Sequence, residues 1–291
     1  MVAQLTPHGA ERVRVNLPAG QLVALRADPA QPAGAVAVLV PGYTGSKEDF
    51  AALLDPLCSA GLSVLAVDLP GQYESPGPPR EQDYYPEPLG RTLTTLVCRL
   101  TSGGRRVLLL GHSYGGLVCR AAVLAGAPVT GLTLLGSGPA ALPTGQRRAL
   151  MDATEPVLRA HGVHAVAQLL QDRDDGVIPA ELAALRRERL LRSTPAGLLG
   201  MAAALRTEPD RVAELAAALR ARAIPCLVVF GAADDVWPPP LQRTMASRLG
   251  AMVATIPGAA HSPNTENPQG LINTLVPIWR RWLTGAHNRS P

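Results

Sequence analysis

The five residues Gly111-His-Ser-Tyr-Gly115 form the pattern in this sequence that predicts chemistry most directly. The apolar residues 107–110 predict a buried strand before them, and residues 115–124 predict a helix directly behind them. A serine at such a turn projects its hydroxyl outward, and the flanking positions must be small because a Cβ atom there would collide with the neighbouring strand or helix. The N-terminus of the helix also favours developing negative charge. We therefore predict that Ser113 is a nucleophile.

A serine hydroxyl needs a base to take its proton, and the base needs an acid to orient it. His261 is the predicted base, because it follows an expected strand and precedes the last expected helix. Asp234 is the predicted acid and Asp235 is the alternative, since both lie in the loop after the apolar residues 226–230. A carboxylate in that loop can reach a histidine in the loop after the next strand.

The other histidines and the cysteines that could bind a metal or react are interpreted as structural residues. His161 and His164 are three residues apart in an expected helix, a spacing that metal ligands can use. No Asp, Glu or Cys stands at a convincing spacing beside them, so we interpret them as part of a solvated helix face. The 4 cysteines lack C-x-x-C spacing and lie in apolar patterns typical of buried free thiols. We expect no metal, no cofactor and a reducing compartment.

The composition predicts a globular chain with a sizeable core. Of the 291 residues, 47% are hydrophobic and 17% are charged, and the formal net charge is +4. Binding of nucleic acid needs clustered basic residues with stacking aromatics, and no such stretch is present, so nucleic acid is not an expected partner. No apolar run approaches the roughly 18 residues of a membrane helix, and no signal peptide is recognisable. We expect a cytoplasmic protein with no membrane span; the sequence does not indicate its oligomeric state.

The order of the apolar segments predicts an α/β fold. Residues 12–16 and 21–26 indicate a β-hairpin. Six further segments are typical of strands buried on both faces, at residues 35–40, 62–67, 107–110, 129–135, 226–230 and 252–256. Helical patterns lie between them or close the chain, at residues 50–57, 88–100, 115–124 and 268–283. A hairpin followed by repeated β–α units predicts a doubly wound, mostly parallel, eight-stranded sheet.

The segment between the sixth and seventh expected strands is too long for one crossover helix. Five helical patterns fill it, at residues 144–160, 164–171, 179–191, 195–205 and 210–222. Their aliphatic residues alternate with arginines and acids, so the helices are amphipathic and pack against another part of the chain. We predict an inserted helical cap of residues 140–222 on a core domain of residues 1–139 and 223–291.

These features together resemble the α/β-hydrolase family, in the branch that uses a serine nucleophile and carries a helical cap. The resemblance covers roughly residues 10–285. It rests on the turn at Ser113, on the order Ser113, Asp234, His261, and on the spacing Gly231-x-x-Asp234-x-x-x-Pro238. Residues 68–77, which begin Asp-Leu-Pro-Gly and end Ser-Pro-Gly, are similar to the loop after the family's fourth strand. The family places its lids where this chain has its predicted cap.

The resemblance also implies where an oxyanion would bind. The family uses two backbone N–H groups, one from the residue after the nucleophile, here Tyr114, and one from the loop after the third strand, here Tyr43. Two departures are present in this chain. Pro41-Gly42 stands where many relatives have His-Gly, and Gly71-Gln72-Tyr73 stands where they have Gly-His-Gly. The oxyanion donors are main-chain groups, so neither departure removes them.

The few aromatic residues predict part of a substrate pocket. The 5 tyrosines fall in loops expected at the carboxyl ends of strands, where open α/β sheets bind ligands, and Trp237 follows Asp234 by three residues. The expected cap contains no aromatic residue. We predict a pocket with Tyr73 and Trp237 at its rim and an aliphatic roof, which suits an acyl chain or an alicyclic group. The alternative is that tyrosines simply favour half-exposed loops.

The function that these predictions favour is hydrolysis of an ester or thioester of a small to medium, largely apolar acyl group, through an acyl-enzyme on Ser113. The same family includes C–C bond hydrolases, acyltransferases and perhydrolases, which remain alternatives. A different class is a low-turnover receptor that keeps the Ser113, Asp234 and His261 arrangement to bind a small molecule. A third alternative is a scaffold with an unreactive serine.

Overall fold

A single sheet forms the centre of the protein, whose computed structural model describes residues 2–174 and 176–285. Its strands lie in the order β1-β2-β4-β3-β5-β6-β7-β8. Their bounds are β1 (Glu11–Leu17), β2 (Gly20–Ala27), β3 (Ala35–Val40), β4 (Ser63–Val67), β5 (Arg106–His112), β6 (Gly131–Leu135), β7 (Cys226–Gly231) and β8 (Met252–Ile256). The pairs β1–β2 and β2–β4 are antiparallel and all other pairs are parallel. The prediction of a mostly parallel, eight-stranded sheet is therefore confirmed.

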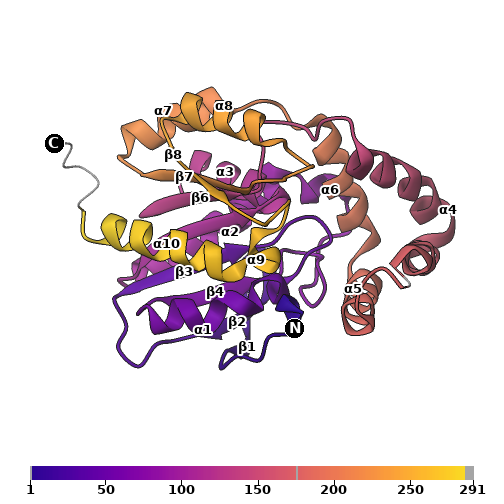
Figure 1. Ribbon diagram of the computed structural model, residues 1–291, viewed down its shortest axis with the longest axis horizontal. Helices are drawn as coiled ribbons and strands as arrows, with labels where there is room; N and C mark the ends of the chain where they lie inside the picture. The colour runs from indigo at the N-terminus through magenta and orange to yellow at the C-terminus, as the bar shows by residue number, and fades with distance from the viewer. Residues whose placement is uncertain (1, 175, 286–291) are drawn as a thin grey trace.

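Helices cover both faces of the sheet, as Figure 1 shows. Helices α1 (Ala51–Ser59) and α10 (Pro268–Leu283) pack on one face. On the other face lie α2 (Pro86–Ser102), α3 (Tyr114–Leu124), α7 (Val212–Ala221) and α8 (Pro239–Leu249). The central strands can be apolar throughout because both of their faces are covered; all six residues of β3 are buried.

The carboxyl ends of β3 and β5 lie next to each other in the sheet. These two strands pair in parallel with Val40 opposite Gly111. The loop after β3, which carries Tyr43, therefore begins beside the turn that carries Ser113. The register of the sheet thus brings the two segments together although about seventy residues of chain separate them.

The sequence analysis did not predict helix α8, nor the short helix α9 (Pro263–Glu266). Helix α8 is the longer of the two. Helix α8 begins at Pro239, directly after Pro238, and contains Pro240 in its first turn. Proline is compatible with the first turn of a helix because the N–H groups there have no helical acceptor. The same prolines favour a loop when the sequence is considered alone.

Three helices form a layer at one end of the sheet, and we call them the cap helices (Figure 1). They are α4 (Gln146–Asp174), α5 (Ala180–Arg192) and α6 (Pro195–Thr207). Helix α4 is broken at Gly162, where φ is 75°, so its halves correspond to the helices expected at 144–160 and 164–171. Helix α7 also lies within the predicted cap range 140–222, and it contacts α3 and α8 on the face of the sheet. None of the helices in the described residues is long and apolar enough to cross a membrane.

Candidate active site

The turn between β5 and α3 holds Ser113 in a backbone conformation that is unusual for a residue with a side chain, at φ 54° and ψ −121°. Such strain costs on the order of 1–3 kcal/mol and persists only where the surroundings enforce it. Here the Ser113 N–H donates to the Leu135 carbonyl at 2.8 Å. A Cβ atom on Gly111 would lie 2.3 Å from the Gly115 carbonyl oxygen, and one on Gly115 would lie 2.4 Å from that of Val40. Both glycines are therefore needed for the close approach of strand and helix.

Ser113, His261 and Asp234 form a continuous chain of hydrogen bonds. The distance from Ser113 Oγ to His261 Nε2 is 2.9 Å, and from His261 Nδ1 to Asp234 Oδ1 it is 3.1 Å. The three residues follow β5, β8 and β7, so all of them lie at the carboxyl ends of parallel strands. Each is less than a tenth exposed. The arrangement gives the serine a base and gives the base an anionic partner.

The surroundings of Asp234 keep its carboxylate ionised. Burial by itself raises the pKa of Asp234, but hydrogen bonds from His261, the Val236 N–H and the Gln242 side chain outweigh it, and the net result is a lowered pKa. The Val236 N–H donates to Oδ1 at 2.9 Å and Gln242 Nε2 donates to Oδ2 at 2.8 Å. Gln242 also donates to the Trp237 carbonyl at 2.6 Å. It belongs to the unpredicted helix α8, so no signal in the sequence pointed to it.

Asp235, the alternative acid, lies in a different environment. Its side chain is half exposed, and its carboxylate is 3.9 Å from the Arg147 guanidinium. Among the described residues, Asp234 is the carboxylate that contacts the His261 ring.

His112, the residue before Ser113, lies beside this chain of hydrogen bonds. It is buried, and its ring centroid lies 5.1 Å from that of His261. His112 Nε2 lies 3.0 Å from the His261 carbonyl oxygen, which can only accept, so this nitrogen carries the proton. Burial lowers the pKa of His112 to about 4, which keeps the ring neutral near pH 7. The hydrogen bond from His112 Nε2 to the His261 carbonyl holds the backbone of His261 in place.

The two backbone N–H groups expected to bind an oxyanion lie close to Ser113. Tyr114 is the first residue of α3, and Tyr43 follows Gly42, whose added Cβ atom would lie 3.0 Å from Ser113 Cβ. Within the described part of the chain, no other backbone group accepts a hydrogen bond from the N–H of Tyr43 or of Tyr114. Both donors are therefore available to a ligand at Ser113.

A cavity of about 850 Å³ opens above Ser113 and His261. Its core side includes Tyr43 and Trp237, and its volume lies within the range of ordinary ligand pockets. The cap contributes many aliphatic side chains, among them Leu142, Leu150, Met151, Leu158, Leu198 and Leu199. Tyr43 packs against both the core and the cap clusters of apolar residues, so it joins the two layers.

Arginines also line the cavity from the cap side. They are Arg147, Arg186, Arg187 and Arg189. The acidic residues of the wall are already engaged: Asp49 binds Arg189 at 2.6 Å, Glu155 binds Arg206 at 2.7 Å, and Glu266 accepts backbone N–H groups. Arg147 is itself paired with Asp235 at 3.9 Å, so the wall combines paired charged side chains with its aliphatic surface.

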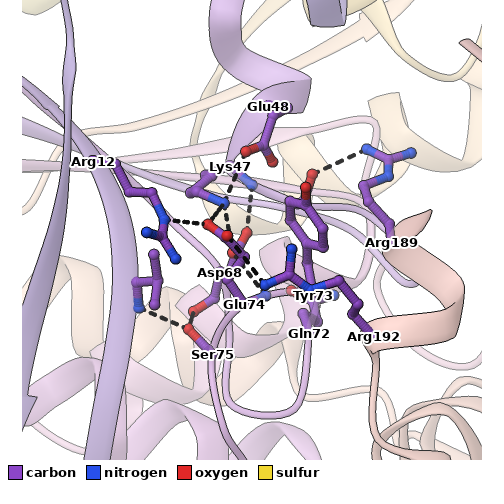
Figure 2. A network of polar contacts seen from close by, with 12 residues as sticks. Arg12, Lys47, Glu48, Asp68, Gln72, Tyr73, Glu74, Ser75, Arg189 and Arg192 are labelled. Carbon is purple, nitrogen blue, oxygen red and sulfur yellow. Dashed lines mark hydrogen bonds and ion pairs between the residues drawn. The ribbon is translucent and has the colours of Figure 1, made fainter. Parts of the chain in front are cut away.

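Tyr73 lies in a different place from the one that the sequence suggested. It does not line the cavity. Two cations lie near its ring, with Lys47 Nζ at 4.4 Å and the Arg192 guanidinium carbon at 4.7 Å from the ring centre, and its hydroxyl donates to Glu188 at 3.0 Å. The prediction that Tyr73 forms the pocket rim is wrong for this cavity, because the ring stabilises buried positive charge instead (Figure 2).

Lys47 is the centre of a buried ionic cluster next to the loop after β3, as Figure 2 shows. Its Nζ lies 2.8 Å from Glu48, 2.9 Å from Asp68 and 2.8 Å from Glu74. Burial lowers the pKa of Lys47, but these carboxylates outweigh it and raise the pKa on balance. We call Lys47 and its three carboxylates the Lys47 cluster. Arg192 of α5 reaches Glu74 at 3.2 Å, so the cluster also connects the core to the cap helices.

Comparisons with known proteins agree with this geometry. Residues 37–274 match the model of the Alpha/beta hydrolase family. The 2-succinyl-6-hydroxy-2,4-cyclohexadiene-1-carboxylate synthase of Salmonella typhimurium is 28% identical over 260 residues, which span 87% of this chain and 96% of that protein. In the described residues, no group of three or more His, Cys, Asp or Glu side chains could hold a metal ion.

Solved structures with low sequence identity share the fold. A thermophilic esterase from Thermogutta terrifontis has a TM-score of 0.72 at 23% identity and covers 94% of this chain and 99% of its own. An enol-lactonase from Burkholderia xenovorans LB400 has a TM-score of 0.72 at 19% identity, with 92% and 100% covered. The match over residues 37–274 includes the serine turn, Asp234 and His261, and the chain belongs to the alpha/beta hydrolase family.

Proposed function

We propose that this protein is a cofactor-independent serine hydrolase that cleaves an ester or thioester of a small to medium, largely apolar acyl group. The observation that carries the proposal is the hydrogen-bonded chain from Ser113 through His261 to Asp234 at the floor of the cavity. A serine, a base and an orienting acid in this order are the parts that acyl transfer through a covalent intermediate requires.

The reaction follows from the positions of these groups. Ser113 Oγ attacks the substrate carbonyl carbon while His261 Nε2 takes the hydroxyl proton, and the carbonyl oxygen becomes an oxyanion. The N–H groups of Tyr43 and Tyr114 donate to that oxyanion, and Asp234 stabilises the positive imidazole ring. As the tetrahedral intermediate collapses, the bond to the leaving group breaks and His261 returns its proton to that group. Water then repeats the sequence on the acyl-enzyme and releases the acid.

The walls of the cavity support an apolar acyl group. Most of the side chains that the cap contributes are aliphatic, and an acyl chain placed against them would bury apolar surface worth about 25 cal/mol per Å². We also propose a cytoplasmic location, because all four cysteines are free thiols, as a reducing compartment requires.

A series of p-nitrophenyl esters from acetate to dodecanoate tests the proposal. The wild-type protein should hydrolyse them with a preferred chain length, and Ser113→Ala should lower kcat by more than about 10³-fold, because residues of such a triad act as a unit. Ser137→Ala is the matched control, because Ser137 is also a buried serine, lies beside α3 and does not line the cavity. The control should keep its turnover. Equal turnover by wild type and Ser113→Ala would overturn the proposal.

Among the described residues that line the cavity, four are arginines and three are acidic, and this excess favours a second candidate, in which the substrate carries a carboxylate. The synthase from Salmonella typhimurium is named for a product with a carboxylate group, which fits such a wall. In the ester series, faster cleavage of a p-nitrophenyl monoester of a dicarboxylic acid than of an alkanoate of equal length would favour this candidate. If no ester is cleaved, the alternatives are C–C bond hydrolysis, acyl transfer, perhydrolysis, or binding of a small molecule by a low-turnover receptor.

A further inference from the structure

We propose that Gln72 is a positioning residue for the oxyanion hole, which is formed by the N–H groups of Tyr43 and Tyr114. Gln72 acts by fixing the plane of the peptide between Gly42 and Tyr43. The inference rests on the proposed function, since it assigns a purpose to the Tyr43 N–H. Gln72 lies in the loop after β4, and neither its role nor its partners were visible in the sequence, where it appeared only as a departure from the Gly-His-Gly of relatives.

The side chain of Gln72 is buried and both ends of its amide are engaged. Its exposed fraction is 3%. Gln72 Nε2 donates to the Gly42 carbonyl oxygen at 2.7 Å, and Gln72 Oε1 accepts the Leu69 N–H at 3.1 Å. The second contact fixes which end of the amide is the donor, because the Leu69 N–H requires an oxygen. Figure 2 shows Gln72 beside the Lys47 cluster, within the same loop as Tyr73 and Glu74.

The Gly42 carbonyl oxygen is held from two directions. Besides Gln72 Nε2, the Gly45 N–H donates to it at 3.0 Å. A carbonyl oxygen has two lone pairs, so these donors together define the orientation of the carbonyl group. The peptide is planar and trans, so the Tyr43 N–H points opposite to the Gly42 C=O. Fixing the Gly42 oxygen on the side of Gln72 therefore fixes the N–H on the opposite side of the same peptide.

The loop that carries this peptide needs such support. Thr44, the next residue after Tyr43, has φ 57°, a conformation that costs energy for a residue with a side chain. The loop also passes close to Ser113, since a Cβ atom on Gly42 would lie 3.0 Å from Ser113 Cβ. A rotation of the peptide between Gly42 and Tyr43 would turn the Tyr43 N–H away from the oxyanion.

The loop that carries Gln72 is itself anchored to the core. The Gly71 N–H donates to the Ser75 carbonyl at 3.1 Å, and the Ser75 N–H donates to the Gln72 carbonyl at 2.9 Å. Ser75 Oγ donates to the Asp68 carbonyl and accepts the Val23 N–H, both at 2.8 Å. The hydrogen bond from Gln72 to Gly42 thus links this anchored loop after β4 to the strained loop after β3.

Gln72→Leu tests the proposal by removing the donor while keeping the size of the side chain. With a p-nitrophenyl ester, kcat should fall on the order of 10- to 100-fold with little change in KM, because a misdirected oxyanion donor loses part of the 10²–10³-fold that such a donor contributes. The Ki of an alkyl boronic acid, which forms a tetrahedral adduct with the serine, should rise by a similar factor. Tyr73→Phe is the control in the same loop and should change neither quantity.

Gln72→Glu provides a second test with a pH readout. A protonated carboxyl group can donate to the Gly42 oxygen and accept from the Leu69 N–H as the amide does, whereas a carboxylate repels that oxygen. The ratio of kcat for Gln72→Glu to kcat for wild type should therefore rise as pH falls. A general loosening of the fold would leave this ratio independent of pH.

The outcomes separate this inference from the proposed function. If the wild type is active and Gln72→Leu has the same kcat, the positioning role is overturned and the serine mechanism stays intact. The same follows if the ratio of kcat for Gln72→Glu to kcat for wild type does not change with pH. Wild type without turnover on any ester and without affinity for the boronic acid overturns both. If Gln72→Leu does not fold, as far-ultraviolet circular dichroism would show, the Gln72→Glu ratio decides.

Discussion

Asp234→Asn is expected to lower kcat by about 10⁴-fold on the preferred ester, while Asp235→Asn changes it little. Asparagine keeps the size of the side chain, but it carries no charge and can present an N–H to His261 Nδ1, which favours the wrong tautomer of the ring. The lowered pKa of Asp234 shows that its surroundings already favour the anion. Asp235 is half exposed and faces Arg147, so its charge has no comparable role.

Steady-state kinetics of the two variants on one ester give the comparison. The two substitutions are chemically identical and lie at adjacent positions, so each controls for general effects of the other on the loop after β7. A large loss in Asp235→Asn with full activity in Asp234→Asn would exchange the two roles. Equal and small losses would contradict an orienting acid in this loop.

Lys47→Met is expected to destabilise the fold by about 3–5 kcal/mol, because removing one partner of a buried ionic group leaves uncompensated charge behind. The side chain of Lys47 is 1% exposed and contacts three carboxylates. Even beside Lys47, burial raises the pKa of Asp68 to about 6. Without the cation this pKa rises further, so the folded state of the variant takes up a proton as pH falls. The loss of stability should therefore be greatest above the raised pKa of Asp68 in the variant, and it should shrink as the pH falls from there towards about 6.

Urea unfolding at several pH values measures this effect. Arg248→Met is the control, since the pair between Arg248 and Asp210 is about 40% exposed on both sides and such a pair contributes at most about 1 kcal/mol. Asp68→Asn added to Lys47→Met should recover part of the stability, because it removes one orphaned charge. A Lys47→Met protein as stable as wild type at pH 7 would contradict the account of this cluster.

Local patterns in the sequence were enough to predict the sheet and the hydrogen-bonded chain at Ser113. The turn at residues 111–115 is determined by sterics within a few residues, and Gly111 and Gly115 each face backbone that no Cβ atom could approach. Asp234 and His261 follow neighbouring parallel strands, so the order of the strands alone brings them together. The apolar strands could be recognised because burial on both faces leaves no polar positions.

Side-chain partners that are distant in sequence could not be predicted in the same way. Gln242 reaches Asp234 from a helix whose initial prolines favour a loop, and Gln72 reaches Gly42 across thirty residues. Tyr73 appeared suited to a pocket rim, and only the positions of Lys47 and Arg192 show that its ring lies elsewhere. Such contacts depend on how loops pack against each other, which no single segment encodes.

Covalent labelling of the serine tests the central claim most directly. The protein should react with a fluorophosphonate, and mass spectrometry of the digested product should place one adduct on Ser113. Labelling should be abolished in Ser113→Ala and strongly slowed in His261→Ala, because the hydroxyl is a weak nucleophile without its base. An adduct on another residue, or equal labelling of wild type and Ser113→Ala, would contradict the account.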